Sequence, residues 1–280
     1  MSSAPSVLQP LLDAGYEVSF VSHAQAILTV DFPAVLEELV DVLNTLTIPI
    51  EEIIGSGGGE TKGTQRLRRG LAARHWTKQN FRIEKAINGV PRESISHEVD
   101  HVRTLVAEDG VATSVALEIE WNNKDPFFDR DLENFKRLHA EGAISAGVIV
   151  TRGSTLQAAM PGLVRRWVDQ HEIDSHEDLK RCGIAQTERQ QREVLKRVER
   201  SANPIPFREA WTSHFVGDKF GTATTHWSKL DDRVKRGVGN PCPLLLIGIP
   251  DSTVTFGEDP AVVAELLDEG AAELAGETSV

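Results

Sequence analysis

The chain has little cysteine and no long apolar run. Its 280 residues include only two cysteines, Cys182 and Cys242, too few for a disulfide framework or for a zinc cluster of their own. It has no stretch of about 18 apolar residues, so a hydrophobic transmembrane helix is not expected. The first residues, Met-Ser-Ser-Ala-Pro-Ser, lack the basic and apolar regions of a secretory signal. We therefore expect a cytoplasmic protein.

A phosphate-binding P-loop is also missing. Residues 55–64, Gly-Ser-Gly-Gly-Gly-Glu-Thr-Lys-Gly-Thr, are rich in glycine but lack the Gly-Lys-Ser/Thr ending that such a loop needs. An ATPase is therefore not expected. The segment is either a plain surface loop or a loop that becomes ordered on a ligand.

Basic charge is scarce overall, and it is unevenly distributed. The net charge of -12 argues against a protein that coats DNA non-specifically. Residues 258–280 carry acids and no Lys or Arg, and we expect an acidic C-terminal tail or helix after a single domain over 1–257. Residues 62–92, in contrast, are strongly basic. A basic patch on an acidic body suits a protein that binds a polyanion at one face, although a solvated helix face would give the same pattern.

Two strand-like runs, 94–107 and 111–121, are separated by Glu-Asp-Gly, a strong hairpin signal. A three-residue loop sets Asp100 directly opposite Glu118, whereas a two-residue loop places these two acids on opposite faces. We predict the three-residue loop, because Gly110 can supply the left-handed residue that it requires.

Alternation along the second strand gives it one acidic face. Glu118, Glu120 and Asn122 share this face. Neighbouring acids repel each other, and a divalent cation removes the repulsion. Asp100 and Glu118 would be natural Mg²⁺ ligands, with Glu120 as general base or second metal ligand, in a site that hydrolyses phosphodiesters. The alternative is a polar strand face in contact with solvent.

The remaining pattern predicts an α/β fold, a mixed β-sheet flanked by helices on both faces. One predicted helix begins at Asp125-Pro126 and has an apolar stripe of Phe128, Leu132, Phe135 and Leu138. Another has Asp31 as its cap. The other predicted elements are helices over 31–48, 66–85, 161–171 and 176–201 and buried strands over 143–151 and 242–249.

A rival motif overlaps the acids. Residues His97, Glu98 and His101 match the H-E-x-x-H signature of zinc proteases, which works only on a helix, where both histidines share a face. The surrounding residues form a poor helix. On a strand, His97 and His101 would face away from Asp100 and serve as structural histidines.

The residues around the acids resemble type II restriction endonucleases of the BglII and BstYI kind, within the PD-(D/E)xK nuclease group. The resemblance runs from 75–80, His-Trp-Thr-Lys-Gln-Asn, to 151–153, Thr-Arg-Gly, and is looser at 221–227 and 239–243. In this pattern an aspartate on one strand precedes Glu-x-Glu, Glu-x-Gln or Glu-x-Lys on the next.

The resemblance implies a PD-(D/E)xK restriction-endonuclease-like core and particular roles for its residues. Asp100, Glu118 and Ile119 would bind Mg²⁺, with Mn²⁺ able to substitute, and Glu120 would take the position of the commoner lysine. A polar helper would fall at Gln79 or Asn80. The residues implied or suggested to contact DNA are Lys62, Lys78, Asn80, Asn122, Asn123, Lys124, Thr224, Thr225 and His226.

The resemblance also implies partners. Relatives act as homodimers on palindromic double-stranded DNA, with a GATC core in this group, inside bacterial cells. A cognate DNA methyltransferase would share the site without having to bind the enzyme. The alternatives are a repair or mobile-element nuclease on the same core and a non-catalytic DNA-binding protein with a degenerate site.

Overall fold

A computed structural model describes residues 5–55, 61–106, 110 and 112–257. Its centre is a six-stranded mixed sheet in the order β1-β7-β6-β5-β4-β3. Strands β5, β6 and β7 run parallel to one another, and the outer strands pair antiparallel. The strands of this sheet are β1 (Glu17–Val21), β3 (Thr77–Ile87), β4 (Val90–Val106), β5 (Ala112–Glu120), β6 (Ala146–Arg152) and β7 (Leu244–Ile249).

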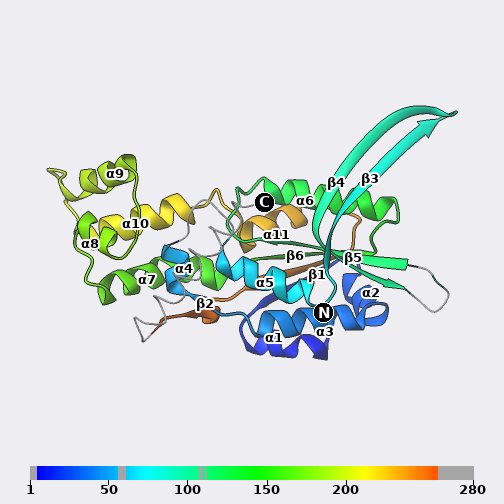
Figure 1. Cartoon of the computed structure of the whole chain (residues 1–280), viewed down its shortest axis with the longest axis horizontal. Helices are drawn as coiled ribbons and strands as arrows, with labels where there is room; N and C mark the ends of the chain where they lie inside the picture. The colour runs from blue at the N-terminus through cyan, green and yellow to red at the C-terminus, as the bar shows by residue number, and fades with distance from the viewer. Residues whose placement is uncertain (1–4, 56–60, 107–109, 111, 258–280) are drawn as a thin grey trace, which may run out of the picture. The chain divides into compact units, whose positions relative to one another are not determined.

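Helices cover both faces of this sheet (Figure 1). Helices α6 and α11 pack on one face, and α2, α3 and α5 lie on the other. The helices are α1 (Gln9–Asp13), α2 (Ala24–Val30), α3 (Pro33–Asn44), α4 (Ile50–Ile54), α5 (Lys62–Ala72), α6 (Phe127–Ala140), α7 (Ser154–Gln170), α8 (His176–Arg181), α9 (Glu188–Val198), α10 (Phe207–Lys219) and α11 (Trp227–Lys235). The α/β prediction is confirmed.

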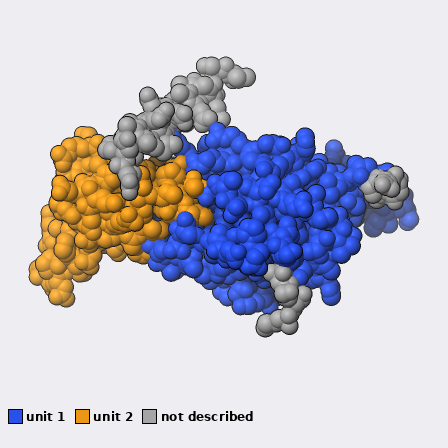
Figure 2. Space-filling model, turned by 90° about the horizontal axis from the view of Figure 1, so that it is seen from below, with its two compact units in different colours: residues 1–46, 62–160, 215–252 blue, residues 47–61, 161–214, 253–280 orange. Residues whose placement is uncertain are grey.

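The chain divides into two compact units, coloured separately in Figure 2. The first comprises residues 1–46, 62–160 and 215–252 and contains the six-stranded sheet. The second comprises 47–61, 161–214 and 253–280, and in it β2 (Ile48–Pro49) pairs in parallel with β8 (Val254–Thr255). Within the described parts of both units, no helix is long and apolar enough to span a membrane.

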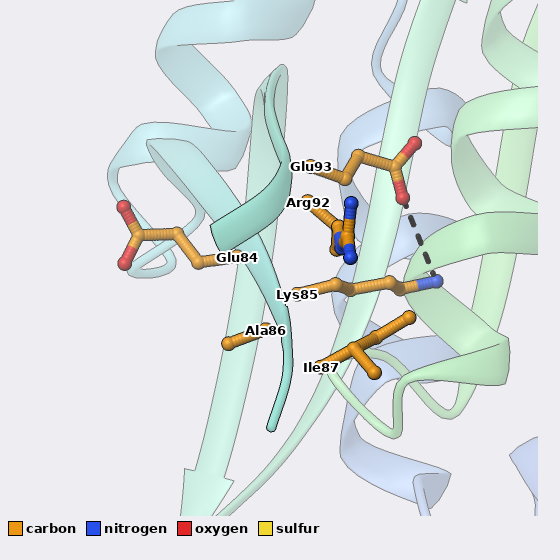
Figure 3. Close-up of a pocket in the computed structure, with 6 residues that line it drawn as sticks. All are labelled: Glu84, Lys85, Ala86, Ile87, Arg92 and Glu93. Atoms are coloured by element: carbon orange, nitrogen blue, oxygen red, sulfur yellow. Dashed lines mark ion pairs between the residues drawn. The ribbon is translucent and has the colours of Figure 1, made fainter. Parts of the chain in front are cut away.

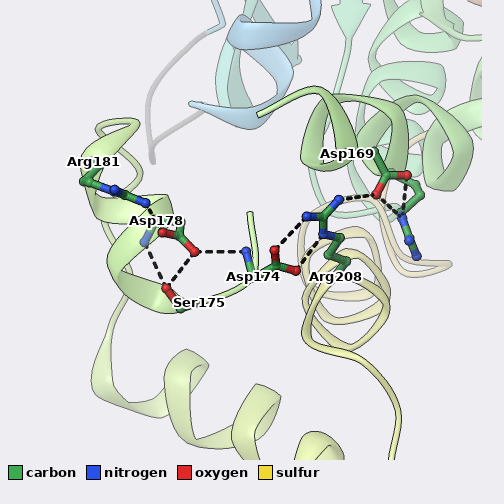
Figure 4. A network of polar contacts seen from close by, with 7 residues as sticks. Asp169, Asp174, Ser175, Asp178, Arg181 and Arg208 are labelled. Atoms are coloured by element: carbon green, nitrogen blue, oxygen red, sulfur yellow. Dashed lines mark hydrogen bonds and ion pairs between the residues drawn. The ribbon is translucent and has the colours of Figure 1, made fainter. Parts of the chain in front are cut away.

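A polar network ties helices together inside the second unit (Figure 4). The guanidinium of Arg208 donates to both carboxylate oxygens of Asp174 at 2.7 Å and to Asp169 at 3.2 Å. Arg165 donates to Asp169 from one turn away. Beside these residues the Ser175 hydroxyl accepts from the backbone N–H of Asp178 and caps α8.

The predicted hairpin register is confirmed. His101 lies opposite Leu117 and Val106 opposite Ala112, and one further step in this register sets Asp100 opposite Glu118. The loop itself falls largely at 107–109 and 111, outside the described residues.

The predicted buried stripe of α6 is also confirmed, since Phe128, Leu132, Phe135 and Leu138 are fully buried. The acidic segment 258–280 likewise lies outside the described residues.

The predicted helix over 66–85 is wrong in its second half. Helix α5 ends at Ala72, and residues 77–87 form β3, which turns at Asn88-Gly89 into β4. Both turn residues have positive φ, 52° and 79°, as a tight two-residue hairpin requires. The basic segment is therefore split between a helix and a strand. Beyond the rest of the sheet, β3 and β4 continue as a two-stranded arm (Figure 1).

Three smaller expectations also need correction. The predicted helix over 176–201 is two helices, α8 and α9, because the chain turns at Gly183 with φ 74°. Neither Asp31 nor Asp125 caps a helix: Phe32 precedes α3, and Pro126 precedes α6, without side-chain caps. Strand β1 was not predicted, and it pairs with β7 at the end of the sheet.

Candidate active site

Strand β5 points its even-numbered residues toward α6. Ala116 belongs to the core that includes the buried stripe of α6, and Glu118 and Glu120 follow on the same face toward the end of the strand. Both carboxylates are buried, with only 7% of Glu118 and 2% of Glu120 exposed. The acidic strand face predicted from alternation is thus present, but it faces a helix rather than open solvent.

Asp100 on β4 is adjacent to Glu118. Its backbone N–H donates to Glu118 Oε1 at 3.3 Å. The register of β3 on β4 shifts between Val99 and Val102, so the chain bulges at this point. The Asp100 side chain is 57% exposed and forms an ion pair with Lys78, whose Nζ lies 3.6 Å from Asp100 Oδ1. Asp100 therefore forms the solvent-facing rim of the acid site, and Glu118 its interior.

The interior acids hold protons tightly. Burial, followed by repulsion from Asp131 and Asp100, raises the pKa of Glu118 to about 9. Burial and the nearby Asp131 raise the pKa of Glu120 to about 8, although a hydrogen bond from Asn123 Nδ2 to Oε2, at 2.8 Å, partly opposes this. Without a bound metal ion, both carboxyls favour the neutral form near neutral pH.

Asp131 is a functional candidate that sequence reasoning missed. It lies on α6, it is 1% exposed, and its side chain shares a hydrogen bond with Glu120. Burial raises its pKa, and its charge in turn raises the pKa values of Glu118 and Glu120. Its spacing of three residues after Phe128 and four before Phe135 places it on the buried face, a signal that was available in the sequence.

The donor set fits a hard divalent cation bound in an open site. Asp100 and Glu118 offer carboxylate oxygens, and Ile119 can offer only its backbone carbonyl, all ligands that Mg²⁺ accepts while it keeps several waters. Within the described ranges, no group of three or more His, Cys, Asp or Glu side chains is placed so that it could hold a metal ion by itself, so backbone carbonyl and water oxygens would have to complete the coordination. Two carboxylates and one carbonyl leave positions for water and phosphate oxygens.

Two segments predicted to contact DNA lie side by side next to these acids. Asn123 exchanges backbone hydrogen bonds with the 223–225 segment: its carbonyl accepts from the Thr225 N–H at 2.8 Å, and its N–H donates to Thr225 Oγ1 at 3.0 Å. Lys124 and Thr224 form a β-bridge. The Asn123 side chain then joins this pair of segments to Glu120.

Arg152 secures this pairing from the end of β6. Its Nη2 donates to Thr224 Oγ1 and to the Thr225 carbonyl, both at 2.7 Å. The residue is fully buried, its Nε and Nη1 have no hydrogen-bond partner among the described residues, and burial lowers its pKa to about 9. His226 follows, and burial together with the charge of Arg152 lowers the pKa of its imidazole. The sequence analysis had placed Arg152 within the family resemblance, at 151–153, but had assigned it no role.

The other predicted DNA contacts lie on β3 and α5. Lys78 pairs with Glu98 at 2.7 Å as well as with Asp100. Asn80 accepts a hydrogen bond from Ser96 across the strands, and Gln79, the alternative polar helper, lies opposite Val99. Lys62 begins α5, a helix that packs on β4.

The zinc-protease motif lies on a strand. His97 and His101 belong to β4, and both are buried. The Nδ1 atom of His101 lies 3.3 Å from the Leu117 carbonyl. Burial, followed by the charge of Arg137 on α6, lowers the pKa of His97, and a hydrogen bond with Asn134 partly opposes this. The helical face that this motif requires is therefore absent from 97–101.

A hollow lies in the arm formed by β3 and β4 (Figure 3). None of the predicted site residues lines it, and Lys85 in its wall pairs with Glu93 at 3.9 Å and with Glu141 at 2.9 Å. Its lining consists of Glu84, Lys85, Ala86, Ile87, Arg92 and Glu93. Charged residues of the lining form ion pairs within the chain, Glu84 with Arg82 and Lys85 with Glu93 and Glu141, so the hollow does not extend the acid site.

Comparison with known proteins decides the family. The family model of restriction endonuclease BglII/BglIII matches residues 16–249. The chain belongs to this family. A comparison with curated proteins gave no significant match. The matched range of the restriction endonuclease BglII/BglIII family runs from β1 to β7 and contains all the residues of the acid site.

Proposed function

We propose that the chain is a type II restriction endonuclease that makes Mg²⁺-dependent double-strand cuts at a short palindromic DNA site. One observation carries the proposal: Glu118 and Glu120 are buried next to Asp100, and the paired segments 122–124 and 224–226 adjoin them. These segments offer amides, hydroxyls and a lysine, which suit contacts with bases and phosphates. Family membership supports the same reading.

Each acid has a distinct task in this proposal. Asp100, Glu118 and the Ile119 carbonyl would hold Mg²⁺, which when bound neutralises the phosphate and lowers the pKa of a water. With Mg²⁺ bound, Glu120 would be ionised, so that it could orient the attacking water and accept its proton. Asn123 fixes the direction of the Glu120 carboxylate by donating to it. The water attacks phosphorus in line with the leaving oxygen.

The assembly belongs to the proposal as well. A homodimer with a two-fold axis would match a palindrome, and each subunit would cut one strand. A cognate methyltransferase protects the same DNA site without needing to bind the enzyme. Mn²⁺ is expected to replace Mg²⁺, because it accepts the same oxygen ligands.

The first test is the product pattern on unmethylated plasmid and phage DNA, with Mg²⁺ or with EDTA. We expect discrete fragments in Mg²⁺ and none in EDTA. A smear would retain the nuclease and refute site-specific cutting, which would favour a repair or mobile-element enzyme. DNA binding without strand scission, on several differently methylated substrates, would instead support a non-catalytic DNA-binding protein.

A further inference from the structure

The acid site holds more carboxyl groups than its predicted chemistry needs. Glu118, Glu120 and Asp131 are all nearly fully buried, and they come from a strand and a helix that pack together. A DNA phosphodiester that enters this site is itself an anion, and negative charge increases on its oxygens during attack by water. Repulsion between this developing charge and the site's carboxylates opposes the attack unless a cation is present in addition to a bound metal ion.

Arg130 brings such a cation to the site. It lies on α6 beside Asp131, and its Nε donates to Asp131 Oδ1 at 2.8 Å. Its Nη2 lies 3.6 Å from Glu120 Oε1, so one guanidinium contacts acids of both elements. Within the described part of the chain, it is the cation that pairs with Glu120, since Lys78 pairs with Asp100 and Glu98 at the rim.

The guanidinium of Arg130 is held in place but remains accessible. It lies over the Phe127 ring, 4.4 Å from the ring centroid, which restricts its motion. Its side chain is 54% exposed, and no contact of Nη1 is found among the described residues. An arginine keeps its charge at every working pH and has a planar set of donors that matches phosphate oxygens. One side of the group therefore binds the acids while another is open to a ligand.

We propose that Arg130 is a catalytic residue that donates from its exposed side to the phosphate of the strand being cut while its other side positions Glu120. This inference rests on the proposed function. Arg130 thereby supplies the positive charge that the Glu-Ile-Glu motif at 118–120 lacks.

The test compares Arg130→Gln and Arg130→Lys with the wild-type chain on a plasmid that the wild type cuts, under single-turnover conditions with Mg²⁺. Lys136→Gln is the matched control, because it removes a positive charge from the same helix at a residue that pairs with Glu133 and with none of the acids of the site. DNA affinity is measured separately in EDTA by filter binding. Thermal melting establishes that each variant is folded.

We expect Arg130→Gln to cleave about 100-fold more slowly, the usual effect of removing one donor to a developing oxyanion, with DNA affinity changed less than about threefold. Arg130→Lys should recover to within about tenfold of wild type, because it keeps the charge, and Lys136→Gln should match wild type. If Arg130→Gln and wild type cleaved at the same rate, the role of Arg130 would be refuted, and the proposed nuclease function would stand. Equal impairment of Lys136→Gln and Arg130→Gln would also overturn it, because loss of any positive charge on the helix would then have the same effect. A wild-type chain that cuts no DNA would overturn the proposed function together with this inference.

Discussion

Replacing Glu118 by Gln should stabilise the metal-free protein, and the gain should grow with pH. Glu118 has an ordinary pKa of 4.5 that burial raises to about 9, so the folded chain retains a proton that the unfolded chain releases. Stability attributable to this group is fully present at low pH and is lost as pH rises through this window. Glutamine has the same shape, keeps an oxygen for the Asp100 N–H, and does not titrate.

The size of this effect follows from the pKa difference. Each pH unit between the two pKa values changes the free energy of unfolding by about 1.4 kcal/mol, which gives about 4 kcal/mol between pH 4.5 and 7.5. Water drawn in by the charged carboxylate reduces this, and we expect about 2 kcal/mol. For a chain of this size, the melting temperature of Glu118→Gln should exceed that of wild type by roughly 4–8 °C at pH 7.5.

The assay is thermal melting followed by circular dichroism in EDTA, from pH 4.5 to 9. Glu133→Gln is the control, because Glu133 is half-exposed on α6 and pairs with Lys136. The control should follow the wild-type curve. Addition of millimolar Mg²⁺ should raise the melting temperature of wild type more than that of Glu118→Gln. A difference between Glu118→Gln and wild type that does not change with pH would refute the reasoning.

Three further predictions concern other residues. Arg152→Met removes the donors to Thr224 and Thr225 and should weaken DNA binding in EDTA by about tenfold or more; unchanged affinity in filter binding would contradict this role. Asn123→Ala removes the donor to Glu120 and should slow single-turnover cleavage by about tenfold with little change in melting temperature, and an unaltered rate would count against it. Cys242 is fully buried, and burial raises the pKa of its thiol to about 12. Ellman's reagent should therefore label only Cys182 in the native protein. Two fast-reacting thiols would contradict this, because the core around Cys242 would then have to open.

Much of the central sheet could be predicted because its residues follow local rules. The Glu-Asp-Gly sequence before position 111 set the hairpin register, and this register brought Asp100 to Glu118. The apolar runs that became β6 and β7 were long, uninterrupted and bounded by turns, as central parallel strands are. The stripe of α6 also had an unambiguous period of 3.6 residues.

The arm could not be recognised from charge alone. Residues 77–87 are rich in Lys, Arg and Glu, which favour helices, yet the strand is stabilised by cross-strand pairing with β4 and by the Asn88-Gly89 turn. That dipeptide was a hairpin signal that the prediction did not use. Asp131 was missed for a different reason: its spacing from Phe128 and Phe135 marks the buried face of α6, but an acidic residue is seldom fully buried.

The pairing of segments 122–124 and 224–226 was beyond sequence reasoning. Each segment was a candidate DNA contact by residue type, but about 100 residues separate them in the chain. Their adjacency depends on Arg152, a buried cation with neutral partners at the end of β6. The sequence contained this residue without any local pattern to mark it as buried.

The most direct test of the account compares DNA cleavage in Mg²⁺ by wild type, Glu118→Gln and the control Glu133→Gln, all shown to be folded by melting. We predict that wild type and Glu133→Gln give the same discrete fragments. Glu118→Gln should still bind the DNA but should cut it at least about 100-fold more slowly. Cleavage by Glu118→Gln at the wild-type rate would contradict the assignment of Asp100, Glu118 and Glu120 as the hydrolytic site.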